Sequence, residues 1–371
     1  CSSNIFFSPA SIYSAFSILL AGTAGETEEE IKKALHVAHK KDNKKLHKAI
    51  ANELDRLTAS TTETKVCMAN KIFLDKDFPV KNPYLSLVNA FYSATPELLT
   101  FADSENSRTH INQWVEERTE KKICELFPAG SIDGLTKMVI ANAIYFKGLW
   151  ALHFEKSDTK DAKFTLPDGR KKDIKLMYNY MEETSFCDFK DMEAKAVCLS
   201  FKESKLRMFI LLPNREDGLP QLLQKLFTVG PTPHGSGDKR HLDMFLSLTY
   251  YSTWEVNLYL PRFKIGVGDT SMNLVDTMNK LGVSKIFDHK VADFSSLTDA
   301  GGLYVSSIVH CAVLEVDEDG AEAAAATGIS EGIECSMPPP PVDFKVTHPF
   351  VVAIADDQGT PLFLGHVSDP K

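Results

Sequence analysis

The stretch LTKMVIANAIYFKGLW, residues 135–150, limits the folds that this chain can adopt. From Met138 to Phe146 the run is apolar at both odd and even positions, and Asn142 is its one amide side chain. A strand with one face in water would alternate apolar and polar residues, whereas a strand covered on both faces does not. The run therefore predicts a central strand of a sheet that is covered on both sides.

Helices and a further strand are predicted on the N-terminal side of this run. The segment NIFFSPASIYSAFSILLAGTAGETEEEIKKAL, residues 4–35, predicts two packed helices, the first starting at Ser8-Pro9 and the second at Thr27. Residues 40–59 predict another helix, and KVCMANKIFLDKD, residues 65–77, predicts an alternating strand. SRTHINQWVEERTEKKICELF, residues 107–127, predicts an amphipathic helix.

Strand signals dominate the C-terminal side. GPTPHGSGDKRH, residues 230–241, predicts a surface loop, and DDQGT, residues 356–360, predicts a hairpin turn. No internal repeat or domain linker is found. The strand-like runs are Ala196–Phe201, Arg207–Leu212, Trp254–Tyr259, Ala312–Val316, Phe350–Ala355 and Leu362–Gly365.

Composition bounds the class of protein. With 371 residues, 43% of them hydrophobic, the chain can bury a large core. A net charge of −9 argues against a general nucleic-acid binder, and no apolar run approaches the length of a membrane span. Seven scattered cysteines and the lack of an N-x-[ST] sequon favour a reducing compartment, but a secreted unglycosylated chain would look the same. Localisation therefore stays open between extracellular and cytoplasmic.

Signatures of catalysis and of metal or cofactor binding are missing. The sequence holds no HExxH, GxSxG or phosphate-binding loop. His310 stands alone in the apolar run SSIVHCAVLEV, without a second ligand at strand spacing, and is interpreted as a hydrogen-bonded core histidine. We therefore predict that the protein is not an enzyme and holds neither a metal nor a cofactor.

The stretch EDGAEAAAATGISEGIECSMPPPP, residues 318–341, has side chains that are too small to form a hydrophobic core. Its turn-forming residues do not have the spacing of an ordinary loop. Read as a strand, it places small or apolar side chains on one face, and the other face is polar or small. Such a strand can enter a crowded sheet without burying bulk or charge. The first face consists of Ala321, Ala323, Ala325, Thr327 and Ile329.

Six blocks of the sequence resemble, in order and over nearly the whole chain, the signature blocks of the serpin family. They are NIFFSPASI, INQWVEERTEKKI, ANAIYFKGLW, YLPRFKI, AVLEVDEDGAEAAAAT and HPFVVAIADDQGTPLFLGHVSDP. The resemblance implies one mixed α+β domain over residues 1–371 with three β-sheets, eight or nine helices and an exposed reactive-centre loop at 318–341. It also implies a monomer, and a chain that begins after the family's first helix.

The resemblance implies inhibition of a serine protease by a suicide-substrate mechanism. The target cleaves the loop and forms an acyl-enzyme, and the loop then inserts into the large sheet before the ester is hydrolysed. The alternative is a non-inhibitory member of the family, such as a carrier, chaperone or storage protein. Members of that kind tend to carry proline, charge or bulk on the inserting face. This loop carries none of these before Glu331, which falls on that face near its end.

Several residues match the family's functional positions. Ser8, Ser11, Asn142 and His310 match the shutter, a hydrogen-bonded cluster beneath the point where the sheet opens. Trp150 matches the breach, where the loop first enters, and Arg262 with Glu318 matches a salt bridge there. The hinge of the loop, 318–327, comprises Glu318, Gly320, Ala321, Glu322, Ala323, Ala324, Ala325, Ala326 and Thr327.

The reactive bond is placed by counting along the loop. The family's loop length counted from Glu318 gives Glu334-Cys335, and counting back from Phe344 gives Cys335 or Ser336. Glu334 implies a target with a basic pocket, granzyme-like or glutamate-specific. Ile333 or Met337 would instead suit an elastase-like or chymotrypsin-like protease.

A second partner is suggested by the basic run Lys32–Lys48, which could bind a sulfated glycosaminoglycan. The alternative is a solvated pair of helices, because Glu28, Glu29 and Glu30 adjoin the run and no arginine strengthens it. The sequence leaves these two interpretations open.

Overall fold

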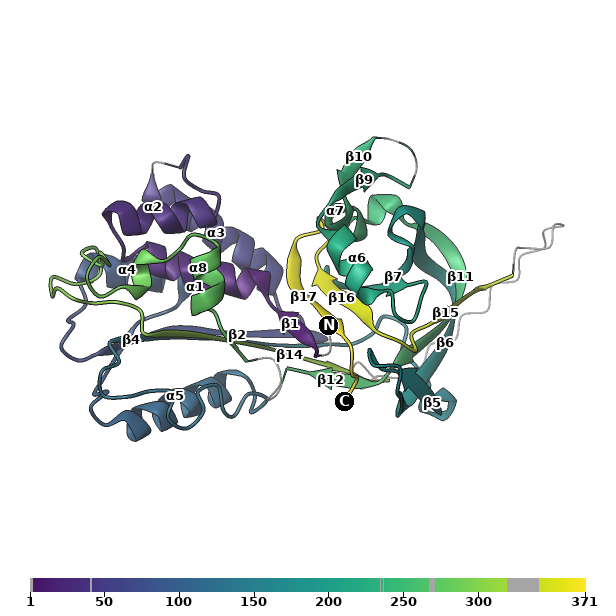
Figure 1. Cartoon of the computed structure of the whole chain (residues 1–371), viewed down its shortest axis with the longest axis horizontal. Coiled ribbons are helices and arrows are strands. Elements are labelled where there is room, and N and C mark those ends of the chain that lie inside the picture. Colours follow the sequence, from purple (N-terminus) through teal and green to yellow (C-terminus); the bar gives the residue numbers. More distant parts are fainter. Residues whose placement is uncertain (1–2, 41, 234, 236, 267–270, 319–339) are drawn as a thin grey trace.

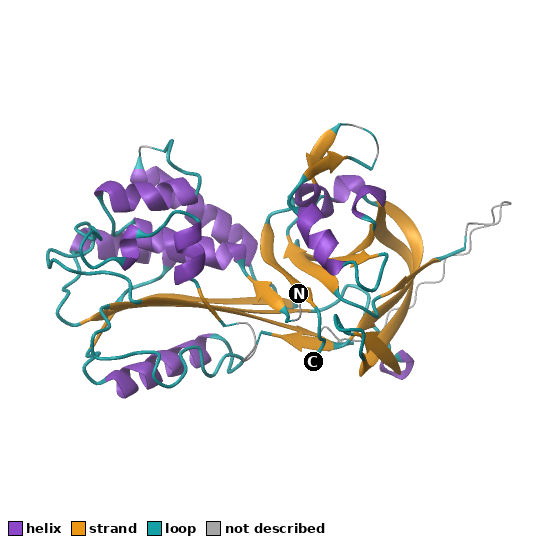
Figure 2. Cartoon of the chain, in the orientation of Figure 1, coloured by secondary structure: helices purple, strands orange, loops and turns teal. Residues whose placement is uncertain are grey.

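A computed structural model describes residues 3–40, 42–233, 235, 237–266, 271–318 and 340–371. The chain forms two large sheet systems with helices around them (Figures 1 and 2). In addition to the helices and strands below, four single turns of 3₁₀ helix lie at Lys156–Asp158, Lys190–Met192, Leu248–Tyr250 and Lys285–Phe287. No helix formed by the described residues is long and apolar enough to cross a bilayer.

The six-stranded sheet has the predicted central strand, β4, near its middle. The order is β12-β14-β4-β2-β3, with β13 paired to β14 beside β12. Strand β4 is antiparallel to β2 and parallel to β14. The strands are β2 Thr64–Asp75, β3 Glu97–Leu99, β4 Met138–Gly148, β12 Phe263–Ile265, β13 Met272–Asn273 and β14 Ser307–Val316.

Both faces of this sheet are covered, which explains the uninterrupted apolar run in β4. Ile140, Ile144 and Phe146 pack into the core beneath the upper helices, whereas Val139 and Tyr145 pack into a second core with helix α5, Ser104–Arg118. Figure 1 shows α5 alone under the sheet. The upper helices are α1 Pro9–Leu20, α2 Gly25–Ala34, α3 Asn43–Thr58, α4 Asn82–Tyr92 and α8 Val275–Lys280.

Strand β6, Lys171–Phe189, organises the nine-stranded ladder. Along one edge it pairs with β11; along the other, residues 171–176 pair with β5 and residues 185–189 with β7. The two halves of this ladder and the six-stranded sheet are the three sheets expected. The other strands are β1 Ile5–Phe7, β5 Lys160–Thr165, β7 Ala194–Ser200, β8 Arg207–Pro213, β11 Ser252–Pro261, β15 Val342–Lys345, β16 Phe350–Ala355 and β17 Pro361–Val367.

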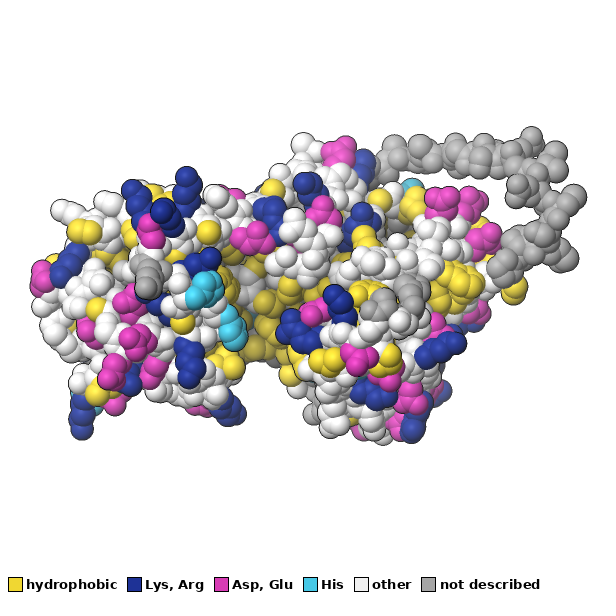
Figure 3. Space-filling model, turned by 90° about the horizontal axis from the view of Figure 1, so that it is seen from above, with side chains coloured by type: hydrophobic (Ala, Val, Ile, Leu, Met, Phe, Trp, Pro, Cys, Tyr) yellow, Lys and Arg dark blue, Asp and Glu magenta, His cyan; other side chains and the backbone are white. Residues whose placement is uncertain are grey.

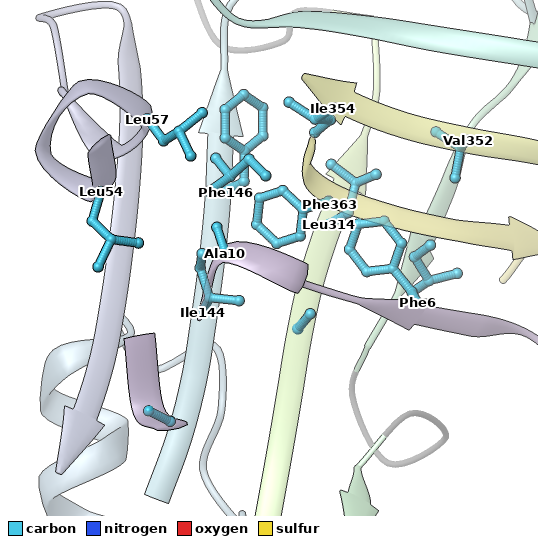
Figure 4. Packing of buried hydrophobic residues seen from close by; sticks show 14 of the residues in the cluster. Phe6, Ala10, Leu54, Leu57, Ile144, Phe146, Leu314, Val352, Ile354 and Phe363 are labelled. Atoms are coloured by element: carbon cyan, nitrogen blue, oxygen red, sulfur yellow. The ribbon is translucent and has the colours of Figure 1, made fainter. Parts of the chain in front are cut away.

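Aromatic side chains join the two sheet systems. Phe6 of β1 stacks on Phe363 of β17 with ring centroids 5.2 Å apart, and Phe146 of β4 meets Phe363 edge-on at 6.0 Å (Figure 4). Beside this junction the surface is hollowed between the helices and the nine-stranded ladder, and apolar side chains are exposed there (Figure 3). Tyr13 and Ile50 line the hollow with Pro361.

The predicted start of the first helix is confirmed, and that of the second is two residues late. The Ser8 hydroxyl accepts a hydrogen bond from the Ser11 N–H at 3.1 Å and caps α1, with Pro9 in its first turn. Helix α2 starts at Gly25 rather than Thr27. The Thr27 hydroxyl accepts from the Asp293 N–H at 3.1 Å instead of capping the helix.

Two predicted segments are wrong. The helix predicted over 107–127 ends at Arg118, because the next turn contains Glu120 and Lys121 at positive φ, and Asn112 Oδ1 accepts from the Leu126 and Phe127 N–H groups. The loop predicted over 230–241 contains a hairpin of β9, Val229–Pro231, and β10, Asp238–Arg240. This hairpin lies beside the unpredicted helices α6, Leu219–Leu226, and α7, His241–Phe245 (Figure 1).

Candidate functional site

The seam between β4 and β14 is the centre of the candidate site. Eight residue pairs, from Ser307↔Val139 to Leu314↔Phe146, join the two strands directly and in parallel. After β14 the chain is described to Glu318 and resumes at Pro340, before β15 pairs in parallel with β11. Outside the described residues lie the predicted hinge residues Gly320, Ala321, Glu322, Ala323, Ala324, Ala325, Ala326 and Thr327, and the reactive-bond candidates Ile333, Glu334, Cys335, Ser336 and Met337.

A row of polar side chains crosses three strands at mid-seam. His310 of β14 is in register with Asn142 of β4, which is in register with Asn70 of β2. The His310 Nδ1–H donates to Asn142 Oδ1, and Asn142 Nδ2 donates to Asn70 Oδ1. His310 and Asn142 are fully buried. The polar row therefore ties the seam to the next strand through hydrogen bonds shielded from water.

The start of α1 closes the polar row from above. The Ser8 N–H donates to His310 Nε2 at 3.0 Å, and Asn142 Nδ2 donates to the Ser11 carbonyl at 2.9 Å and to its hydroxyl at 2.8 Å. The Ser11 hydroxyl in turn donates to Asn70 Oδ1 at 3.2 Å. The four predicted shutter residues thus lie together, with α1 anchored over the seam.

Burial keeps His310 neutral. Desolvation lowers the pKa of His310 from 6.5 to about 3, against a smaller opposing effect of its hydrogen bond with Asn142. The Ser8 N–H can only donate, so Nε2 must be the accepting nitrogen and Nδ1 carries the proton. With both ring nitrogens occupied, His310 has no position left for a substrate or a metal ion.

The polar row includes one residue that sequence reasoning missed. Asn70 has the same local pattern as Asn142, an amide inside a strand and next to an alanine, and this was the available signal. Its place beside Asn142 depends on the β2–β4 register, which the sequence alone does not reveal.

The predicted breach residues lie at the end of β14. The Trp150 indole N–H donates to the Asp317 carbonyl at 2.9 Å, and its ring stacks on Phe201 with centroids 4.8 Å apart. Arg262 Nη1 lies 3.8 Å from Glu318 Oε2, which places the predicted salt bridge at the long end of the ion-pair range. Trp150 therefore fixes the chain immediately before the predicted hinge.

Glu318 is held from several directions. Its side chain is only 6% exposed; its Oε1 accepts from the Thr159 hydroxyl at 2.8 Å, and its carbonyl accepts from the Phe154 N–H at 3.1 Å. Arg262 is 57% exposed, so water weakens its attraction to the carboxylate. The short Thr159 contact is consequently the firmer anchor of the Glu318 side chain.

Glu315 near the end of β14 carries a separate ion-pair network. Lys122 Nζ lies 2.8 Å from one carboxylate oxygen, and Lys264 Nζ lies 2.6 Å from the other. Burial opposes ionisation of Glu315, but the hydrogen bonds from Lys122 and Lys264 prevail and lower its pKa. This pairing ties the end of β14 to β12 and to the segment after α5. Within the described residues, no three His, Cys, Asp or Glu side chains cluster as metal ligands would.

The closed seam, the buried polar row and the fixed strand end define a protein with the serpin fold. The structure of uncleaved ovalbumin matches all of this chain and 94% of that chain, with a TM-score of 0.84 and 24% identity. The structure of Serpin48 from the insect Tenebrio molitor matches all of this chain and 93% of that chain, with a TM-score of 0.83 and 28% identity.

The chain belongs to the serpin family. A family model described as serpin (serine protease inhibitor) matches residues 1–370. Human Serpin B3 is 36% identical over 99% of this chain and 94% of that protein. Leukocyte elastase inhibitor from Sus scrofa is 34% identical over 99% of this chain and 93% of that protein. The chain is thus a member of a family of protease inhibitors rather than of an enzyme family.

Proposed function

We propose that this protein inhibits a serine protease as a suicide substrate, by inserting its loop between β4 and β14. The observation that carries the proposal is the closed seam between β4 and β14. Strand β14 continues through Glu318 directly into a stretch of sequence with small side chains and alternating apolar and polar positions. A strand entering there would find N–H and C=O groups on both neighbouring strands once the seam opened. The inhibitor names of relatives such as leukocyte elastase inhibitor support the same reading.

The proposed reaction is an acyl transfer that is interrupted. The protease serine attacks the carbonyl carbon of the residue before the reactive bond, so that an ester forms, the peptide bond breaks and a new amino terminus leaves with a proton. Hydrolysis of the ester would release both proteins. Insertion must therefore be faster than deacylation, and a hinge without bulk or charge on its inward face favours insertion.

Glu334-Cys335 is the proposed reactive bond. An acidic side chain before the bond needs a cation in the protease pocket, which selects a granzyme-like or glutamate-specific target. Ile333 or Met337 would select an elastase-like or chymotrypsin-like target, and the elastase named in two relatives favours this alternative. Cys335 and Ser336 are the remaining positions given by the count.

A protease panel tests the proposal. The protein is mixed with granzyme B, a glutamate-specific endopeptidase, leukocyte elastase and chymotrypsin, and each mixture is run on a denaturing gel. The expected result with one protease is a covalent band at the summed mass of the two proteins less that of the released C-terminal peptide. Loop cleavage by every protease without such a band would establish a substrate, not an inhibitor.

The C-terminal peptide released from the complex identifies the bond by its mass. A peptide that starts at Cys335 supports Glu334. A start at Glu334 or Pro338 assigns the specificity to Ile333 or Met337, and a start at Ser336 or Met337 assigns it to Cys335 or Ser336. A start before Ser330 would leave too short a strand to insert and would overturn the mechanism.

The alternative function is that of a non-inhibitory serpin, and Glu331 favours it. On the inserted strand this residue falls on the inward face, where an unpaired carboxylate is costly to bury. Complex formation by the wild type decides between the two functions, and Glu331→Ala tests whether Glu331 is the obstacle. If Glu331 hinders insertion, the variant forms more complex per cleaved loop than the wild type; an unchanged ratio shows that Glu331 does not affect insertion.

Binding of a sulfated glycosaminoglycan by Lys32–Lys48 has mixed support. Lys32 Nζ lies 2.6 Å from Glu28, and His47 is buried, with its pKa lowered by desolvation to about 4. In Figure 3, acidic side chains are interspersed with the lysines and arginines of the helices. Elution from immobilised heparin well above about 0.15 M salt would support a site, and elution below it would favour the solvated helices.

A further inference from the structure

Strands β6, β11 and β15 form the end of the nine-stranded ladder that follows the reactive-centre loop, and one of their faces is open to solvent. On the covered face, Val256 and Leu258 of β11 and Phe344 of β15 are fully buried. Side chains alternate between the two faces of a strand, so the residues between these point to solvent. We call this outer surface the tyrosine face; it comprises Tyr178, Tyr180, Glu255, Asn257, Tyr259 and Asp343.

Contacts between neighbouring strands hold the tyrosine face in one arrangement. The Tyr178 hydroxyl donates to Asn257 Oδ1 at 3.2 Å, and Asn257 Nδ2 donates to Asp343 Oδ1 at 3.0 Å. The rings of Tyr178 and Tyr259 lie with their centroids 4.9 Å apart. Side chains that are already fixed lose little conformational freedom when a partner binds. The face is therefore pre-organised for contact with another surface.

Tyr180 is the most open ring of this face. It is 43% exposed, and its hydroxyl donates to Glu255 Oε2 at 2.9 Å. An exposed tyrosine offers a partner both an apolar ring and a polar end, and tyrosine is enriched at protein interfaces for this reason. The exposed ring at the rim of a fixed polar cluster thus has the composition of a protein contact.

The surroundings of Tyr180 are acidic. Its pKa is raised, chiefly by the hydrogen bond to Glu255 and also by the charge of nearby Glu182. Neither Glu182 nor Glu255 forms an ion pair with any described residue, whereas Asp343 lies 2.8 Å from Lys345 Nζ. Two carboxylates therefore stay uncompensated, and they favour a partner that presents lysine or arginine side chains.

The acidic rim lies where the chain enters β15 from the reactive-centre loop. Val342, the first residue of β15, is in register with Val256 of β11. Glu255 directly precedes Val256, and Tyr180 is bonded to Glu255. In Figure 1, β15, β11 and β6 lie together at the end of the molecule opposite α2. The tyrosine face thus continues the surface from which the loop emerges.

A protease that holds the loop is within reach of this face. Val342 follows Glu334 by eight positions, so the proposed bond lies within about 30 Å of the start of β15. A protease domain of about 230 residues is roughly 45 Å across. Its surface outside the active-site cleft can therefore contact the tyrosine face while the loop occupies the cleft.

We propose that the tyrosine face is a second docking surface for the target protease, which binds it through a basic patch outside its active-site cleft. The proposal rests on the proposed inhibitory function. The residue before the reactive bond selects a class of primary pocket, whereas the tyrosine face selects, among proteases with the same pocket, those with the complementary surface charge.

Binding to inactive proteases tests the docking surface without the covalent trap. Each of the four panel proteases is prepared with its active-site serine replaced by alanine and titrated calorimetrically with the intact protein. For the protease that binds most tightly, Tyr180→Ala and Glu255→Lys should each weaken binding about tenfold, and the effect of Glu255→Lys should shrink at high salt. Tyr180→Phe keeps the ring and should retain most of the affinity.

Glu29→Lys is the matched control, because it makes the same change of charge at an exposed residue of the distant helix α2. It should bind as the wild type does. Equal affinity of the wild type, Tyr180→Ala and Glu255→Lys overturns the docking surface, and so does a failure of all four proteases to bind. A dimer of the protein alone that Tyr180→Ala abolishes in sedimentation would assign the face to a second copy and would also overturn the proposal.

Inhibition kinetics separate docking from insertion. With a protease that forms the covalent complex, Tyr180→Ala and Glu255→Lys should lower the second-order rate constant about tenfold and leave the ratio of complex to cleaved loop unchanged, because docking precedes acylation. A changed ratio at an unchanged rate constant would place the effect in insertion and overturn docking. If no protease forms a complex, the proposed function fails, while the titration still decides the docking surface.

Discussion

Asn142 satisfies more partners than any apolar side chain could at the same position. Its amide donates to Ser11 and Asn70 and accepts from His310, so that α1, β2 and β14 all contact one residue of β4. A buried amide is tolerated only where such partners are present. Asn142, the one amide in the apolar run 138–146, is therefore the residue that joins β4 to α1, β2 and β14.

Asn142→Leu should destabilise the protein strongly. Leucine is similar in size but leaves the buried His310 Nδ1–H without its acceptor, at about 1–3 kcal/mol, whereas the Ser11 carbonyl still accepts from the Asn70 amide. The midpoint of chemical denaturation should fall clearly. Asn257→Leu on β11, whose amide donates to the exposed Asp343 and accepts from the Tyr178 hydroxyl, is the control in a less buried setting and should cost clearly less than Asn142→Leu. Equal effects of the two changes would show that the polar row contributes little to stability.

His310 should make stability depend on pH. Its pKa is about 3 in the folded protein and near 6.5 when unfolded, so the unfolded state binds more protons between these values. The contribution of neutral His310 to the free energy of unfolding is therefore fully present above about pH 6.5. It is lost as the pH falls toward 3, by about 1.4 kcal/mol per pH unit. His47, with a pKa of about 4, acts in the same direction.

Denaturation midpoints of His310→Gln at pH 7 and pH 5 test this dependence. The variant should lose about 2 kcal/mol less than the wild type between these values. His39→Gln replaces an exposed histidine, and its denaturation midpoint should depend on pH as that of the wild type does. If His310→Gln also keeps the full wild-type dependence, His310 is not the titrating group.

At the scale of elements, the strongly patterned segments were predicted and the weakly patterned ones were not. Strand β4 and helix α1 were found because burial on both faces and an N-cap leave clear signals. Strand β6 was missed because its opening residues, KKDIKLMYNY, have no long apolar run. Its length comes from partners on both edges, which belong to distant parts of the chain. The shutter residues were named from the resemblance, but their contacts depend on strand register.

A proline on the inward face of the hinge should convert the proposed inhibitor into a substrate. Ala323→Pro removes an N–H that the inserted strand would donate, and Ala321→Arg would force a charge into the sheet. The target should then cleave the loop and be released. Ala324→Arg, on the outward face, is the control and should retain the complex. Undiminished complex with both inward variants would contradict the hinge assignment.

At the scale of the whole molecule, the proposed mechanism implies that the intact protein is not in its most stable arrangement. By that mechanism the six-stranded sheet would take one more strand at the β4–β14 seam, and the stretch after Glu318 has the small side chains for it. Successive residues of the added strand would form ladder hydrogen bonds alternately with β4 and with β14. The resistance of the intact chain to heat or denaturant then depends partly on the kinetic barrier to opening the β4–β14 seam.

Nicking the loop with a non-target protease should make the protein markedly more heat-resistant. Cleavage frees one end of the stretch after Glu318, which can then complete the sheet without a bound protease. Melting curves before and after nicking measure the change, and a chain cut within the surface hairpin β9–β10 is the control. A midpoint that does not rise after loop cleavage would rule out insertion.

The parallel pairing of β4 with β14 also has a consequence for how the chain is made. His310 follows Asn142 by 168 residues, so β4 leaves the ribosome long before the strand that covers its edge exists. At usual rates of synthesis this interval is roughly 10–30 s. Throughout it, the nascent chain presents a long apolar strand with one unpaired edge, which is a template for wrong pairing. Successful production of this protein thus depends on keeping that edge covered during translation.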